Sequence, residues 1–93
     1  SILAAQTADV LITIEGIEAS FVLYHLPDDV IGVSARSQGN VNVQLIMEAL
    51  GGGGHRTVAG AQLSHMTIEE AKAAVQAEAL KAVEQMKKEE QEE

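Results

Sequence analysis

The spacing of apolar residues along the chain alternates between helical and strand-like. From Ile2 to about Leu11 the apolar positions recur with helical spacing, so we predict a helix there. The segments Ala19–Leu26 and Val30–Ser37 are rich in β-forming residues, and Pro27-Asp28-Asp29 between them is typical of a turn. These two segments therefore predict a β-hairpin.

The alternation of residues in the second hairpin strand predicts one apolar and one polar face. Ile31, Val33 and Ala35 alternate with Gly32, Ser34 and Arg36. Because successive side chains in a strand point to opposite sides, the first set faces a core and the second forms a polar strip that ends in a cation.

Helical spacing returns after the hairpin. Asn40 or Asn42 can cap a helix whose apolar positions, Val43, Ile46, Met47 and Leu50, lie on one face, and Gly51 ends it. The next predicted strand is Val58–Ser64, with small residues at its centre. Thr67 and Glu70 form a capping box that opens a final amphipathic helix reaching Met86.

The order of these elements predicts a mixed α/β (α+β) domain. A small mixed sheet that includes the hairpin carries packed helices, in the order α-β-β-α-Gly loop-β-α. A chain of 93 residues suffices for one domain. We assign residues 1–86 to it, and residues 87–93, which include no apolar residue, to a charged, solvated C-terminal tail.

The run Gly51-Gly52-Gly53-Gly54 followed by His55 and Arg56 is the strongest candidate for a binding site. Four glycines cost much backbone entropy on folding, which favours a geometric reason for keeping them. Without Cβ atoms, backbone N–H groups can converge on an anion, and His55 and Arg56 add side-chain donors. The alternative is a flexible linker. Neither a P-loop nor a dinucleotide-binding glycine pattern fits the spacing.

The net charge of the chain and the residue types it contains narrow the range of possible functions. The net charge of −8 argues against a nonspecific nucleic-acid surface, and Arg36 and Arg56 are the only Lys or Arg residues before Lys72. Two scarce cations beside polar and glycine-rich segments indicate a focused anion site, although ordinary surface charge explains them equally well. The chain has no cysteine, and its three histidines have no metal-ligand spacing, so we predict neither a metal site nor a catalytic residue.

The sequence resembles the DHHA1 domain, the substrate-binding C-terminal half of DHH-superfamily phosphoesterases. The resemblance runs from about Ile17 to Ala71. It rests on Ser34-Ala35-Arg36-Ser37, Asn42-Val43, a helix, and Gly51 to His55 followed by Ala59-Gly60-Ala61. The stretches Ile17 to Phe21 and Val43 to Glu48 are similar to the membrane-anchored cyclic-di-AMP phosphodiesterases of the GdpP/YybT type.

This resemblance implies roles for particular residues. It implies a domain that closes over a nucleotide bound to a preceding DHH domain, where two manganese ions activate water. Arg36 and His55 would contact the substrate phosphate, and Gly52, Gly53 and Gly54 would line its approach. Further polar candidates for the same site are Ser34, Ser37, Asn42 and Arg56. The DHH motif is absent from this chain, so we expect the chain by itself to be inactive and to hold no cofactor.

The resemblance also implies partners and a location. The partners are the upstream DHH domain of the same polypeptide and the phosphate of a cyclic or linear adenine dinucleotide such as cyclic-di-AMP, and a homodimer is compatible. We expect a soluble cytoplasmic domain, without direct membrane contact, of a membrane-anchored bacterial protein. The alternative is a nucleic-acid-binding module related to RecJ-like exonucleases, oligoribonucleases or tRNA synthetases, which would prefer a long single strand to a dinucleotide.

Overall fold

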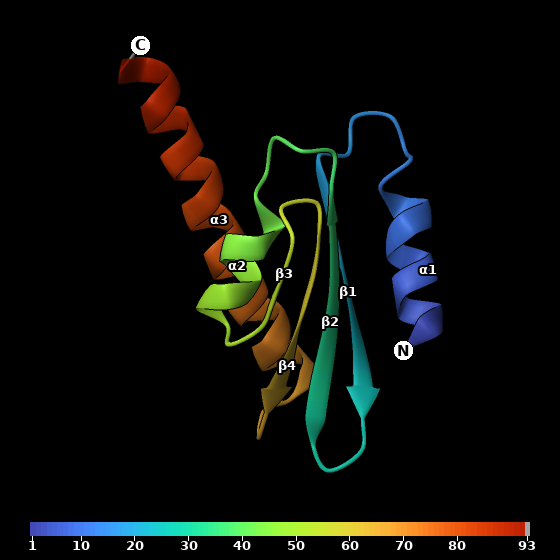
Figure 1. Ribbon diagram of the computed structural model, residues 1–93. Coiled ribbons are helices and arrows are strands. Elements are labelled where there is room, and N and C mark those ends of the chain that lie inside the picture. Colours follow the sequence, from blue (N-terminus) through green and yellow to red (C-terminus); the bar gives the residue numbers. More distant parts are fainter. Residues whose placement is uncertain (93) are drawn as a thin grey trace.

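The computed structural model, which describes residues 1–92, is a four-stranded sheet between two helical layers (Figure 1). Helix α1 (Ile2–Leu11) lies on one side of the sheet, and α2 (Val43–Ala49) and α3 (Ile68–Glu92) lie on the other. The predicted α/β class and element order are confirmed. Helix α1 covers the predicted residues, and Asn42, one of the two predicted caps, accepts a hydrogen bond from the Leu45 N–H at the start of α2.

The sheet is antiparallel throughout, in the order β1-β2-β4-β3. Strands β1 (Ala19–Leu26) and β2 (Val30–Ser37) form the predicted hairpin with the predicted bounds, and β4 (Val58–Ser64) is also as predicted. At the hairpin turn Asp28 and Asp29 adopt left-handed backbone angles, which Asp tolerates better than most residues. The fourth strand, β3 (Gly53–Gly54), lies inside the glycine run, where a loop was predicted.

The hydrophobic core lies between the sheet and the layer formed by α2 and α3. The face of the sheet with Ile31, Val33 and Ala35 packs there, as the alternation in β2 predicts. The largest fully buried side chains are Met47, Val33 and Val43. This layer therefore contains the apolar stripes of both helices.

The opposite face of β2 is less open than its polar residues suggest. Helix α1 packs over β1 and β2 through Ala4 and Ala8, which are both buried. The hydroxyl of Ser20 donates a hydrogen bond of 3.0 Å to the Ala8 carbonyl oxygen. Because α1 covers only the β1–β2 half, the β4–β3 half of this face is left without a helix (Figure 1).

Helix α3 is longer than the predicted helix. It opens with the predicted capping box, in which the Thr67 N–H donates to Glu70 and the Glu70 N–H donates to the Thr67 hydroxyl. Residues 87–92, which belong to the predicted charged tail, continue the helix and are solvent-exposed, while the assignment of 87–93 to a separate tail stays a prediction. Glu93 lies outside the described residues.

Candidate functional site

The strand register brings Arg36 and His55 to the same face of the sheet. Arg36 pairs with Val58 across β2 and β4, and the His55 N–H donates a 2.7 Å hydrogen bond to the Val58 carbonyl oxygen. Directly opposed residues in antiparallel strands share a face. The two predicted phosphate ligands therefore lie in one row across the sheet, on the side that carries α1, although 18 residues separate them between positions 37 and 54.

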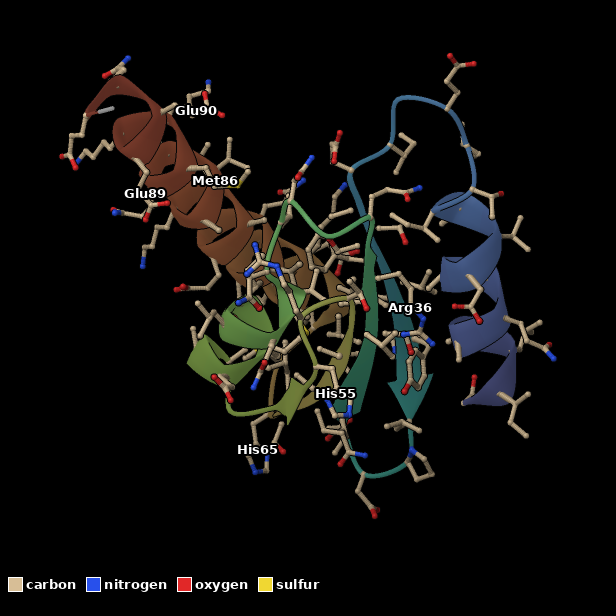
Figure 2. All side chains as sticks on the ribbon, turned by 45° about the horizontal axis from the view of Figure 1, so that its top comes forward. Arg36, His55, His65, Met86, Glu89 and Glu90 are labelled. Carbon is tan, nitrogen blue, oxygen red and sulfur yellow. The ribbon has the colours of Figure 1, made fainter. Side chains whose placement is uncertain are left out.

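The Arg36 guanidinium is held by two protein groups. Its Nε donates to Asp9 Oδ1 at 2.6 Å, and its Nη1 donates to the Ala35 carbonyl oxygen at 2.9 Å. The Arg36 side chain is 12% exposed and the Asp9 side chain is 61% exposed. Figure 2 shows Arg36 between β2 and α1. A guanidinium has five N–H donors, so these two bonds leave donors for an anion while restricting how the group can turn.

The structure requires glycine at three of the four positions of the run, for a different reason at each. Gly51 ends α2 with a φ of 86°, and a Cβ on Gly52 would lie 2.1 Å from the Gly60 carbonyl oxygen. Gly54 combines a φ of 143° with close contact to β4. Gly53 has no such constraint, since a Cβ there would meet nothing within 4 Å. Gly53 is thus the glycine at which a side chain would reach the open face.

The backbone N–H groups of the glycine run, which were predicted to converge on an anion, mostly donate hydrogen bonds to carbonyl oxygens of the protein itself. The N–H groups of Gly51 and Gly52 donate to carbonyl oxygens of α2, at 3.0 Å and 2.7 Å, and that of His55 donates to Val58. What the run leaves accessible is therefore the space beside Gly53 and the exposed His55 side chain.

An open depression of about 620 Å³ lies on the sheet face next to this row. The glycines Gly52 and Gly60 form part of its lining, together with the buried Ser34. Tyr24 and Gln62 also line it. The register pairs Ser34 with Gly60, so the depression crosses β2 and β4 at a row with little side-chain volume.

Three predicted candidates have other roles in the structure. The Ser37 hydroxyl accepts a hydrogen bond from the Gly39 N–H, and the Asn42 side chain caps α2. Arg56 donates through Nε to the Gly39 carbonyl oxygen at 2.7 Å, in a groove it shares with Met86 and two glutamates of α3. These residues shape the loops around the site, whereas Ser34, Gly53, Arg36 and His55 share the sheet face.

Three side chains at this face were not among the predicted site residues. Asp9 comes from α1, and nothing in the spacing of the chain links position 9 to position 36. Tyr24 and Gln62 flank Gly32 in the register, at Tyr24↔Gly32 and Gly32↔Gln62. An alignment of the hairpin strands through their turn places Tyr24 opposite Gly32, but the partner strand of β2 is decided only by the fold.

Within residues 1–92, no group of three or more His, Asp or Glu side chains is arranged to hold a metal ion. The described helices also include none whose length and hydropathy suit a membrane span. The side chains on this face include hydrogen-bond donors and one cation, Arg36, that Asp9 holds in place, and such groups can bind an anion.

The fold and this site define a DHHA1 domain. The model of the DHHA1 domain family matches residues 3–89, and the chain belongs to that family. The match extends the resemblance to α1 and to most of α3, beyond the stretch from Ile17 to Ala71 on which the sequence comparison rested.

Within this family, the chain is similar to several cyclic-di-AMP phosphodiesterases. The chain is 60% identical over 70 residues to the cyclic-di-AMP phosphodiesterase GdpP of Geobacillus thermodenitrificans (strain NG80-2), which covers 75% of this chain and 11% of that protein. It is 55% identical over 71 residues to the cyclic-di-AMP phosphodiesterase PdeA of Listeria monocytogenes serotype 1/2a (strain 10403S), covering 76% and 11%. Identity to GdpP of Bacillus subtilis (strain 168) is 50% over 70 residues, covering 75% and 11%.

These comparisons confirm the resemblance to DHHA1 domains and to cyclic-di-AMP phosphodiesterases. The aligned region makes up 11% of the length of each of these three relatives.

Proposed function

We propose that this domain is the substrate-binding half of a phosphodiesterase site and holds the phosphate of an adenine dinucleotide, cyclic or linear. The observation that carries the proposal is the row formed by Arg36, Val58 and His55 on an open sheet face. The printed names of the relatives supply the substrate class, cyclic-di-AMP.

In this proposal Arg36 and His55 have complementary roles. Arg36 contributes a charge-assisted hydrogen bond to a phosphate oxygen, while Asp9 and the Ala35 carbonyl oxygen hold its guanidinium in place. His55 is exposed at the end of β3 and donates a second hydrogen bond from its imidazole. Gly53, which lies between these residues and the depression, leaves room for the sugar and phosphate.

The reaction itself needs a second partner. We propose that a DHH domain of the same polypeptide binds manganese and supplies the activated water, because the described residues contain no cluster that fits a metal. The sheet face would then close against that domain, with the phosphate between them. We further propose that the parent polypeptide is bacterial and membrane-anchored, with this domain on the cytoplasmic side.

Charge favours a small nucleotide over a long nucleic acid. Arg36 is paired with Asp9, and Arg56 lies among glutamates of α3, in a chain of net charge −8. A long polyanion requires many unpaired cations and shows a steep salt dependence. A salt titration with a dinucleotide and with a long single strand separates the two functions, since tighter, strongly salt-dependent binding of the long strand supports the nucleic-acid module.

The test measures cyclic-di-AMP binding by the full-length protein in metal-free buffer, where turnover does not interfere. Arg36→Ala is expected to weaken binding by about 1.5–3 kcal/mol, the range for a hydrogen bond to a charged group. His55→Ala is expected to weaken it by about 1 kcal/mol or more. Isothermal calorimetry gives both values, and circular dichroism checks the fold.

Matched controls lie elsewhere on the surface. His65→Ala removes an exposed histidine, and Arg56→Ala removes the cation of the other groove. Both are expected to leave the dissociation constant within about twofold. If Arg36→Ala and His55→Ala behave like these controls, the proposed phosphate site is wrong.

A further inference from the structure

We propose that the depression beside the phosphate site is a nucleobase subsite, in which a purine stacks on Tyr24 and is read at its edge by Gln62. The subsite rests on the function proposed above and deepens it, because it names the residues that select the base. Its evidence comes from other residues, in the next rows of the sheet, and from their distance to Arg36.

Tyr24 lies against the sheet where β2 has no side chain. A Cβ on Gly32 would lie 2.3 Å from Tyr24 Cζ and 2.7 Å from its hydroxyl oxygen, so the ring occupies the space above Gly32. Tyr24 is half-buried and also lines the depression. A ring that rests on backbone on one side and borders an open space on the other is a platform for stacking.

Gln62 lies in the same row on the far side of Gly32. The register Tyr24↔Gly32↔Gln62 crosses β1, β2 and β4, and all three residues share the face of Arg36 and His55. Gln62 is exposed, so its carboxamide is accessible to a ligand. A glutamine amide can accept from the N6 amino group of adenine and donate to N7, a pairing that guanine does not offer.

The separation of the two subsites fits a nucleotide. Arg36 and Gly32 are four residues apart in β2, which corresponds to about 13 Å along the strand. Between the two rows lie Ser34 and Gly60, the small residues that line the depression. A phosphate at one end and a base at the other can thus be joined by a sugar that lies over these small residues.

The composition of the chain supports the choice of Tyr24 as the stacking residue. Phe21 and Tyr24 are the only residues among Phe, Tyr and Trp, and Phe21 packs against the core on the other face of β1. Stacking of a base on this sheet therefore has one aromatic ring available. Polar lining from Ser34, Gln62 and Ser64 provides hydrogen-bonding partners around it.

The experiment uses the full-length protein in metal-free buffer and measures dissociation constants for cyclic-di-AMP and cyclic-di-GMP. Tyr24→Leu is expected to weaken cyclic-di-AMP binding by about 5- to 140-fold, the range for loss of one base–aromatic stack. Tyr24→Phe keeps the ring and is expected to stay within about threefold. Gln62→Ala is expected to reduce the preference for cyclic-di-AMP over cyclic-di-GMP by about fivefold or more.

Gln76→Ala is the matched control, since Gln76 is an exposed glutamine of α3 on the opposite side of the sheet. Gln62→Ala keeps the proposal testable even if Tyr24→Leu fails to fold, because Gln62 is exposed. Unchanged selectivity in Gln62→Ala, or normal affinity in a folded Tyr24→Leu protein, overturns the subsite.

The outcomes separate this subsite from the proposed function. Arg36→Ala and His55→Ala act on the phosphate, so a loss of binding there with normal Tyr24→Leu and Gln62→Ala proteins rejects the base subsite alone. Absence of cyclic-di-AMP binding by the unmodified full-length protein rejects both, and binding of cyclic-di-GMP as tightly as cyclic-di-AMP rejects the reading by Gln62.

Discussion

Gly52 and Gly53 are neighbours, yet a side chain at each would meet different surroundings. At Gly52 a Cβ would lie 2.1 Å from a backbone oxygen of β4, whereas at Gly53 it would meet open space. Gly53 also has no left-handed φ, unlike Gly51 and Gly54. The glycine at position 52 is therefore needed by the fold, and that at position 53 is free to serve the ligand.

The substitution Gly53→Val tests this difference between the two glycines. We expect its unfolding free energy to change by less than about 1 kcal/mol, because Val suits a strand and has room. Its isopropyl group lies on the open face, so cyclic-di-AMP binding is expected to weaken by about tenfold or more, about 1.4 kcal/mol. Urea unfolding and calorimetry of the full-length protein give the two values.

Gly52→Ala is the matched comparison and is expected to destabilise the fold by about 1–3 kcal/mol through overpacking against β4. A Gly53→Val protein that binds normally shows that the ligand does not approach over β3. The measurement thus separates a glycine kept for packing from one kept for access.

Among the helices and strands, α3 is stabilised at its start by the hydrogen bonds of its capping box. The Glu70 carboxylate accepts a 2.9 Å hydrogen bond from the Thr67 N–H. This backbone hydrogen bond, with a smaller contribution from the Thr67 side chain, lowers the pKa of Glu70 below its ordinary value of 4.5. The two buried residues of the helix, Ala71 and Val75, lie in its first turns, so the cap stabilises the part of α3 that is most deeply packed on the core.

The lowered pKa predicts a pH-dependent contribution of Glu70 to stability. Because the folded-state pKa lies below the unfolded value, the stabilisation is fully present above pH 4.5 and is lost as the pH falls through the folded-state pKa. Glu70→Gln should therefore be less stable than the unmodified protein at neutral pH, and the difference should shrink on acidification. Urea unfolding at several pH values measures it.

Glu69→Gln is the control for this prediction, since Glu69 occupies the same first turn and is exposed. It removes a charge of the same sign near the helix N-terminus without removing the capping bond. A difference between Glu70→Gln and the unmodified protein that stays constant from neutral to acidic pH contradicts the assigned role of the cap.

At the scale of the whole molecule, the proposed phosphate site lies on one face of the sheet that α1 covers only in part. The α1 helix covers β1 and β2, while the β4–β3 half of the same face carries the depression and His55. The aligned region is 11% of the length of its phosphodiesterase relatives. A partner domain that covers this face would complete the site and exclude water from the phosphate.

This arrangement predicts that residues 1–93 alone hydrolyse no phosphodiester at a measurable rate. The expected result is no release of linear dinucleotide from cyclic-di-AMP in the presence of manganese, followed by chromatography. The full-length protein should show turnover, and His55→Ala should reduce it while circular dichroism remains unchanged. Manganese-dependent turnover by residues 1–93 alone would mean that the chain contains the catalytic groups itself.

The chain by itself determined the elements and their local ends. β-Forming residues and the Pro27-Asp28-Asp29 turn set the bounds of β1 and β2, Asn42 and Gly51 set the ends of α2, and Thr67 opened α3. These features depend on period, capping and backbone preference within a few residues, so they can be predicted without knowledge of the fold. Helix α3 continues through residues 87–92, where helix-forming residues persist although no apolar residue marks a helical period.

Only the tertiary structure decided which residues meet on the sheet face. Asp9 reaches Arg36 because α1 docks over β2, and His55 shares a row with Arg36 because β4 lies between β2 and β3. Gly53 and Gly54 form a strand although glycine disfavours strands, since β4 supplies the pairing. Such contacts depend on long-range packing and register, which no local pattern encodes, and they determine where Tyr24, Gln62 and the phosphate ligands lie.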